Sequence, residues 1–160
     1  MVHLEQMYSQ MEEDKNFLHP NICNYCIDLI KSNLNKSHMF GDRYVLPFQQ
    51  IEAATIKSLQ EFYEKLYSDK YLKNFEIVYW PVNEYHDWHD DTKYYDYTTI
   101  TYLNDGYEGG RTIVGNITIE PTIGKIVKFP ANIRHCVSKL TKGNRYVIVA
   151  WFNKNGKNNS

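Results

Sequence analysis

Residues 75–152 contain a series of short β-type runs, and this pattern constrains the fold most. The runs are rich in β-branched and aromatic residues, and turn residues separate them. They are FEIVYW (75–80), YTTITYLN (97–104), RTIV (111–114), NITIE (116–120), GKIVKFP (124–130), HCVSKL (135–140) and RYVIVAWF (145–152). Many short strands joined by tight turns predict a β-sandwich or a barrel.

The chain before residue 72 has a helical pattern instead. Apolar residues recur at helical spacing in 21–33, behind a proline, and again in 51–67. We therefore expect two helices that back the β-rich part. The length of 160 residues suits one domain with a real core. We predict a single domain with a mainly helical support (1–72), a β core (73–153) and a polar tail (154–160).

Composition excludes several classes of protein. The net charge of −1 provides no overall basic field to recruit nucleic acid. The first 17 residues are polar and acidic, unlike a signal peptide, and no apolar run approaches the roughly 20 residues of a membrane span. Three cysteines are an odd number, which argues against a disulfide framework. We expect a soluble, cytoplasmic protein with no membrane partner; the sequence does not predict its oligomeric state.

Cys23 and Cys26 form a C-x-x-C pair inside the first predicted helix. A zinc site needs more soft ligands than the one remaining cysteine provides, and a redox pair would need a βαβ context that is missing. We interpret both as small buried helix residues.

The segment NEYHDWHDDT (83–92) concentrates two histidines and three aspartates. In an extended strand, residues two apart share a face, so His89 and Asp91 point the same way while His86 and Asp90 point away. One histidine and one carboxylate are half of the two-His-one-carboxylate set that holds ferrous iron and leaves positions open. The histidine that completes such a set would be His135, which is the only one after residue 91 and opens a predicted strand. A solvated acidic loop would explain the His-x-Asp tripeptide at residues 89–91 without any metal.

The runs EIVYWPVNEY, WHDD, TITYLNDGYEGGRT, GKIVKFPANIRHCV and TKGNRYVIVAWF stand in this order along about half of the chain. Together they resemble the iron(II)- and 2-oxoglutarate-dependent dioxygenases, in particular the prolyl-4-hydroxylase-like branch. The resemblance implies a mainly β fold with flanking helices, the double-stranded β-helix (a cupin-like jelly roll). It also implies that His89, Asp91 and His135 are the iron ligands.

The same resemblance assigns a cosubstrate pocket. Arg145 matches the basic residue that anchors the distal carboxylate of 2-oxoglutarate, a role that suits a bidentate, permanently charged guanidinium. Tyr102 matches a tyrosine that supports this carboxylate, and Tyr79 matches a second pocket tyrosine. Thr112 and Trp151 are expected to line the same pocket. Taken without the resemblance, Arg145 could be a surface strand arginine and Tyr102 an aromatic residue of the barrel wall.

The activity implied by the resemblance is hydroxylation of an unactivated C–H bond. Its cofactors would be Fe(2+), 2-oxoglutarate and O2, with ascorbate as an added reductant. The expected substrate is a prolyl or other amino-acid residue in a peptide or protein. A small molecule or a nucleobase as substrate, or a non-catalytic jelly-roll binding module, are the alternatives. The chain lacks the Arg-x-Ser motif of plant-type oxygenases and the second downstream arginine of nucleic-acid demethylases, so a nucleic-acid substrate is disfavoured.

Overall fold

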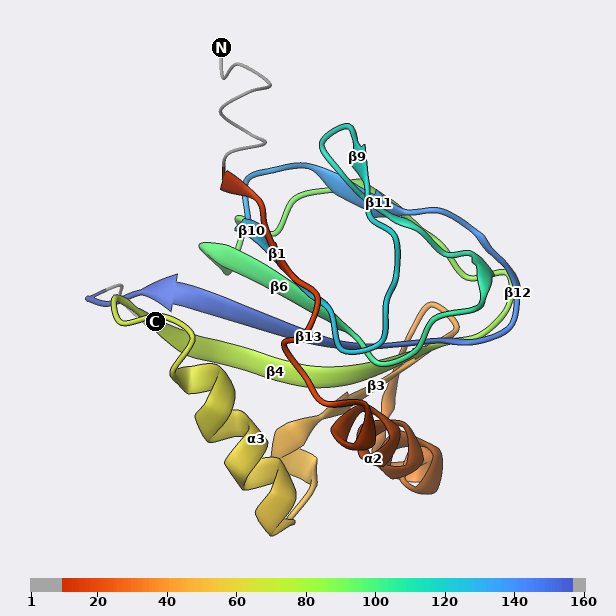
Figure 1. Cartoon of the computed structure of the whole chain (residues 1–160), viewed down its shortest axis with the longest axis horizontal. Coiled ribbons are helices and arrows are strands. Elements are labelled where there is room, and N and C mark those ends of the chain that lie inside the picture. The colour runs from red at the N-terminus through yellow and green to blue at the C-terminus, as the bar shows by residue number, and fades with distance from the viewer. Residues whose placement is uncertain (1–9, 157–160) are drawn as a thin grey trace.

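Two β-sheets that face each other form the centre of the molecule in the computed structural model, which describes residues 10–156 (Figure 1). The larger sheet has the order β1-β10-β6-β13-β4-β3-β2, and the smaller sheet has the order β5-β11-β8-β9. Strands β12 and β7 form a separate pair. Residues 1–9 of the predicted helical support and residues 157–160 of the predicted polar tail lie outside the described part.

The strands and helices have the following bounds. The larger sheet comprises β1 (Glu12–Asp14), β2 (His38–Phe40), β3 (Arg43–Pro47), β4 (Lys70–Trp80), β6 (Tyr97–Tyr102), β10 (Ile126–Pro130) and β13 (Arg145–Lys154). The other strands are β5 (His86–His89), β7 (Glu108–Gly109), β8 (Thr112–Val114), β9 (Ile117–Thr118), β11 (His135–Val137) and β12 (Leu140–Lys142). The helices are α2 (Pro20–Ser32), α3 (Ala54–Glu64) and the short 3-10 turns η1 (Leu34–Lys36) and η2 (Phe48–Gln50).

The long antiparallel pair of β4 and β13 divides the molecule into two cores. Phe75 and Ile77 of β4 belong to the core under the helices, whereas Val78 and Trp80 belong to the core between the sheets. Strand alternation explains this division, because successive side chains point to opposite faces of the sheet. The larger sheet therefore has apolar residues on both faces, each covered by another layer.

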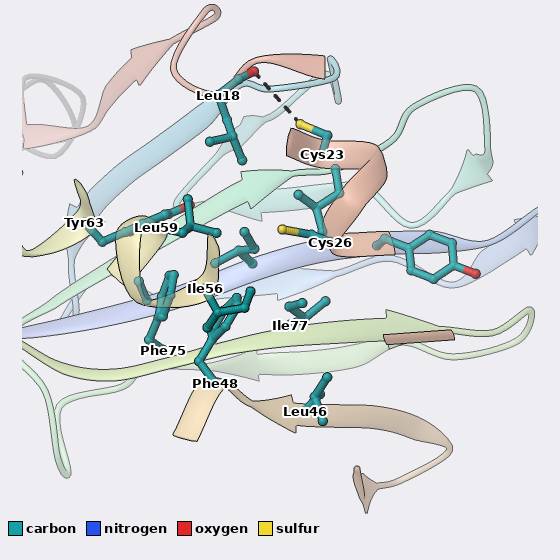
Figure 2. Close-up of a cluster of buried hydrophobic side chains, with 14 of the residues drawn as sticks. Leu18, Cys23, Cys26, Leu46, Phe48, Ile56, Leu59, Tyr63, Phe75 and Ile77 are labelled. Carbon is teal, nitrogen blue, oxygen red and sulfur yellow. Dashed lines mark hydrogen bonds between the residues drawn. The ribbon is translucent and has the colours of Figure 1, made fainter. Parts of the chain in front are cut away.

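Helices α2 and α3 cover the outer face of the larger sheet (Figure 1). Figure 2 shows Cys23 of α2 directed toward the Leu18 carbonyl, and it shows Cys26 of α2 and Ile56, Leu59 and Tyr63 of α3 in one buried cluster with Phe75 and Ile77 of β4. Helix α2 begins where His19 accepts a hydrogen bond from the Asn21 amide through Nδ1 (3.0 Å), with Pro20 in the first turn. Both cysteines are unpaired and buried, which confirms their interpretation as small core residues.

The mainly β, jelly-roll prediction and the two predicted helices are confirmed, but the N-terminal region also contains strands β1, β2 and β3 that the sequence did not predict. Strands β1 and β2 are three residues long and consist of exposed residues at the two edges of the larger sheet, so they have no apolar alternation to detect. No helix of residues 10–156 is long and apolar enough to cross a membrane.

A buried hydrogen bond links helix α3 to the larger sheet, and its removal is a test of this packing. The Tyr63 hydroxyl lies 2.6 Å from the Thr101 hydroxyl, and both residues are completely buried. We expect Tyr63→Phe to lower the free energy of unfolding by about 1–2 kcal/mol, because Thr101 loses its partner. Urea denaturation measures the change. Tyr94→Phe, at a tyrosine that is 60% exposed, is the control; equal stability of both variants would contradict the proposed link.

Candidate active site

A cavity of about 250 Å³ lies between the two sheets. Its floor is the inner face of the larger sheet, where Val78, Ile100, Val147 and Val149 present apolar side chains. Histidines of β5 and β11 in the smaller sheet form the opposite wall. The polar groups of the cavity are therefore few and lie against an apolar background, as is usual for a ligand-binding site.

His89, Asp91 and His135 come together at this cavity. Strands β5 and β11 pair with His89 directly opposite His135, and the Asp91 amide donates to the Ala131 carbonyl (2.9 Å). One ligand atom of each residue lies within 4.8 Å of those of the other two. The Nε2 atoms of His89 and His135 lie 3.7 and 3.3 Å from the two Asp91 carboxylate oxygens. The structure thus brings the three predicted ligands into a two-His-one-carboxylate group that fits a divalent cation.

Backbone carbonyls orient both imidazoles. His89 Nδ1 lies 2.6 Å from the Asp87 carbonyl oxygen, and His135 Nδ1 lies 2.9 Å from the Ile133 carbonyl oxygen. Because a carbonyl can only accept, each Nδ1 carries a proton, and Nε2 is the nitrogen directed toward Asp91. Burial lowers the pKa of His89 despite the Asp87 carbonyl, which keeps that ring neutral. Neutral imidazoles with a fixed tautomer are what a metal ligand set requires.

Asp91 is held by two further donors. The Thr98 hydroxyl and the Trp151 indole Nε1 both donate to Oδ2, at 2.7 and 3.3 Å. Burial by itself raises the pKa of Asp91, but the hydrogen bond and charge of His135, together with Thr98 and His89, outweigh it and lower the pKa. The carboxylate is therefore ionised and fixed in orientation before any metal binds. Trp151 lines the cavity and stacks on Tyr95 with 4.8 Å between ring centroids.

His86 does not point away from the cavity, as the alternation argument predicted. A β-bulge in β5 places His89 opposite His135 but His86 opposite Val137, so three residue steps on β5 match two on β11. The extra residue turns His86 to the same face as His89. The two rings stack with centroids 3.7 Å apart, and His86 lines the cavity. A bulge has no signal in this segment of sequence, so the strand-parity rule failed here.

Arg145 lies at the far end of the cavity and is 1% exposed. Its Nη2 donates to the Thr112 hydroxyl (2.9 Å), which also accepts from the buried Tyr102 hydroxyl (2.7 Å). Among residues 10–156, no carboxylate forms an ion pair with Arg145, and its Nε has no hydrogen-bond partner. A buried guanidinium with an unused donor fits a ligand carboxylate. Arg145, Thr112 and Tyr102 therefore form one cluster, with Arg145 facing the cavity.

The structure does not bring Tyr79 to the cavity. Tyr79 lies on the outer face of the larger sheet, where it stacks between Tyr44 and Tyr146 with ring centroids 5.5 and 4.8 Å away. Its neighbour Trp80 takes the cavity position and lies opposite Arg145 in the β4–β13 register. Adjacent strand residues face opposite sides, so Tyr79 and Trp80 cannot both line the pocket, and Trp80 is the one that does.

Arg43 is a cavity residue that the sequence reasoning missed. It is 7% exposed, its Nε lies 3.1 Å from the Glu84 carboxylate, and its Nη1 lies 3.1 Å from His86 Nδ1. Its guanidinium also lies over the Trp80 ring, 4.4 Å from the centroid. Burial, with the neighbouring His89 and the charge of Arg43, lowers the pKa of His86 to about 3, so the ring is a neutral acceptor for Arg43. No β3 strand was predicted, so nothing in the sequence located Arg43.

Glu76 is the remaining ionisable group of the cavity floor. It faces inward from β4 between Val149 of β13 and Pro47 of β3, to which it is paired in register. Within the described part of the chain, no hydrogen bond or ion pair involves its carboxyl group. Burial raises the pKa of Glu76 to about 7.

These features define a non-haem oxygenase type of site, and comparison with known proteins agrees. The family model described as the 2OG-Fe(II) oxygenase superfamily matches residues 76–153, a range that contains the three metal-ligand candidates and Arg145. Comparison with curated proteins gives no match. This match places residues 76–153 in the 2OG-Fe(II) oxygenase superfamily, which implies iron(II), 2-oxoglutarate and O2 as cofactors.

Solved structures with similar folds cover nearly the whole chain. A viral collagen prolyl hydroxylase from Paramecium bursaria Chlorella virus-1 is 16% identical with a TM-score of 0.71, covering 91% of this chain and 96% of its own. A Pseudomonas putida prolyl-4-hydroxylase is 15% identical with a TM-score of 0.71, covering 92% and 94%. The alpha-ketoglutarate-dependent epimerase SnoN from nogalamycin biosynthesis is 14% identical with a TM-score of 0.72, covering 94% and 82%. These likenesses show the shared jelly-roll fold.

The metal assignment predicts that substitution of Asp91, but not of its neighbour Asp90, weakens metal binding. We expect Asp91→Asn to weaken Mn(2+) binding by at least roughly 100-fold, because one anionic ligand is lost. Asp90→Asn removes the same charge one residue away, at an exposed side chain that binds Thr92, and should leave binding unchanged. Titration calorimetry measures both. Equal Mn(2+) affinity in the two variants would contradict the ligand set.

The environment of Glu76 predicts how stability depends on pH. Its folded-state pKa of about 7 exceeds the ordinary value of 4.5, so the folded protein binds more protons in this window. Stability should therefore fall as the pH rises from 5 to 8, and Glu76→Gln should remove about 1–3 kcal/mol of this loss. Urea denaturation at both pH values measures it. Glu61→Gln, at an exposed position on α3, is the control; parallel curves for wild type and Glu76→Gln would refute the prediction.

Proposed function

We propose that this protein hydroxylates a C–H bond of a prolyl or other amino-acid residue in a peptide or protein, using iron(II), 2-oxoglutarate and O2. The observation that carries the proposal is the joint placement of the His89–Asp91–His135 group and Arg145 on one cavity. A metal-binding group alone has many uses. Here the metal-binding group shares the cavity with a buried guanidinium that forms no ion pair with a carboxylate of the described residues. This combination suits a cosubstrate that chelates the metal at one end and carries a carboxylate at the other.

Each residue of the site has a definite task in this proposal. Iron(II) would be held by Nε2 of His89, Nε2 of His135 and the Asp91 carboxylate, and with 2-oxoglutarate and O2 it supplies the oxidising power for attack on C–H. Arg145 binds the distal carboxylate of 2-oxoglutarate. Thr112 and Tyr102 fix the guanidinium through the shared hydroxyl contacts. The apolar floor excludes water from the reacting groups, which limits side reactions.

The peptide substrate is supported by the similar folds of the viral collagen prolyl hydroxylase and the Pseudomonas putida prolyl-4-hydroxylase. The same chemistry on a small molecule is the second candidate, because SnoN, an epimerase from nogalamycin biosynthesis, has a similar fold. A non-catalytic binding module is the weaker alternative, since such a module needs neither the three ligands nor Arg145. The three unpaired, buried cysteines support a reducing compartment, in line with a cytoplasmic location.

The role of Arg145 is tested by uncoupled turnover. We expect purified wild-type protein to release succinate from 2-oxoglutarate when iron(II) and ascorbate are present, without any added substrate. Arg145→Ala should raise the 2-oxoglutarate concentration needed for half-maximal release by roughly 10–100-fold, through loss of charge-assisted hydrogen bonds. Arg145→Lys should lie between the two, because the charge remains but the fork is lost.

Arg111→Ala is the matched control for this experiment. Its guanidinium donates to the Gly109 carbonyl (2.8 Å), and it does not line the cavity. An unchanged 2-oxoglutarate requirement in Arg145→Ala would assign the anchor to another residue. Failure of the iron-loaded wild type both to release succinate and to bind 2-oxoglutarate would favour the binding-module alternative.

A further inference from the structure

Glu76 is the one charged group facing the cavity that the proposed function leaves without a task. Arg43 is paired with Glu84, Asp91 belongs to the metal group, and Arg145 is assigned to 2-oxoglutarate. Neither arginine forms an ion pair with Glu76, and no other described residue supplies it with a partner. An unpaired carboxylate on an apolar floor is costly to the folded protein, so its presence calls for a partner that arrives with a ligand.

The surroundings of Glu76 define the kind of partner. Trp151 is its diagonal neighbour on the same face, since Glu76 pairs with Val149 and Asn74 pairs with Trp151 in the β4–β13 register. The Trp151 ring lines the cavity and is held by stacking on Tyr95, whose hydroxyl accepts from the Asn74 side chain. A carboxylate and a fixed indole that are neighbours on the same face of the sheet suit a cation, which can make an ion pair and a cation–π contact together.

This corner also touches the metal group directly. The indole Nε1 of Trp151 donates to Asp91 Oδ2 at 3.3 Å. A ligand cation beside Glu76 and Trp151 would therefore lie close to the iron ligands. Val78 and Val149 flank Glu76 on the floor and would receive the methylene groups of a long basic side chain, which commonly lies along apolar surface while its head is paired.

We propose that Glu76 and Trp151 form a subsite for a protonated nitrogen of the substrate, and that the hydroxylated group is the aliphatic chain of a lysyl or arginyl residue in a peptide. This inference rests on the proposed function and narrows its substrate class. A prolyl ring nitrogen inside a peptide is an uncharged amide without a proton, so it offers Glu76 neither a charge nor a donor.

The reaction balances without a further reactant. One oxygen atom of O2 enters the substrate, where a C–H bond breaks and a C–OH group forms. The other oxygen atom enters succinate, as 2-oxoglutarate loses CO2. Two electrons come from the C–H bond and two from the decarboxylation, which together reduce O2. The ammonium or guanidinium group keeps its charge throughout and serves only to position the chain.

The test compares two peptides that differ in one charged group. The probes are acetyl-Gly-Lys-Gly-amide and the same peptide with norleucine, and free lysine is the third probe. Calorimetry under argon measures their binding to the full chain loaded with Mn(2+) and 2-oxoglutarate. We expect the lysine peptide to bind wild type at least 10-fold more tightly than the norleucine peptide. Glu76→Gln should remove this preference, and Glu61→Gln should keep it.

The outcomes separate this inference from the function on which it rests. Equal binding of the two peptides to wild type, or an unchanged preference in Glu76→Gln, overturns the subsite even if succinate is released. A Glu76-dependent preference without succinate release supports the subsite and counts against the oxygenase proposal. Tighter binding of free lysine than of the lysine peptide keeps the protonated-nitrogen subsite and overturns the peptidyl part. Thermal unfolding of Glu76→Gln confirms that the variant is folded.

Discussion

The antiparallel pairing of β4 with β13 is the constraint on which the site depends. Ten residues of β13 find partners along β4, and the two strands form the middle of the larger sheet. Along the regular part of this ladder, from Asn74 to Trp80 on β4, strand alternation then assigns each residue either to the helical side or to the cavity side of the sheet. Arg145 and Trp80 share one rung of this ladder and Val149 and Glu76 share another. The spacing between the two charged groups of the floor is thus set by backbone hydrogen bonds.

A β-bulge between β5 and β11 shapes the part of the smaller sheet that carries the two histidines of the metal group. A regular β5–β11 ladder would place His89 on the cavity side and His86 on the outside. The bulge in β5 brings both rings inward, where His86 stacks on His89 and accepts from Arg43. His86 thereby connects the metal ligand to a buried arginine from the opposite sheet. Bulges commonly re-aim a side chain near an active site in this way.

The sequence predicted those parts of the molecule that local patterns encode. Strands and amphipathic helices show a period of apolar residues in the sequence, which predicted the fold. The segments around His89, Asp91, His135 and Arg145 resemble a known family, which predicted the ligand set. Strand parity failed where the ladder is irregular, at His86. The resemblance assigned Tyr79 to the pocket, but its strand neighbour Trp80 is the residue that faces the cavity. Arg43 and Glu76 were missed for a different reason. Their importance comes from long-range contacts, or from the lack of them, which no local pattern records.

The cavity shows how a few polar groups are made ready for ligands in an apolar setting. Each imidazole donates its Nδ1–H to a carbonyl and leaves Nε2 for a metal. Arg145 donates from Nη2 to Thr112, and its Nε has no hydrogen-bond partner. These hydrogen bonds fix the orientation of each side chain and leave one of its atoms for a ligand. The side chains therefore need to move little when the ligand binds. Glu76 breaks this rule, because no described residue holds its carboxylate in advance. Because the Glu76 carboxylate can be paired only by a group on a ligand, it favours ligands that carry such a group. Glu76 is therefore better suited to selecting the substrate than to holding the cosubstrate.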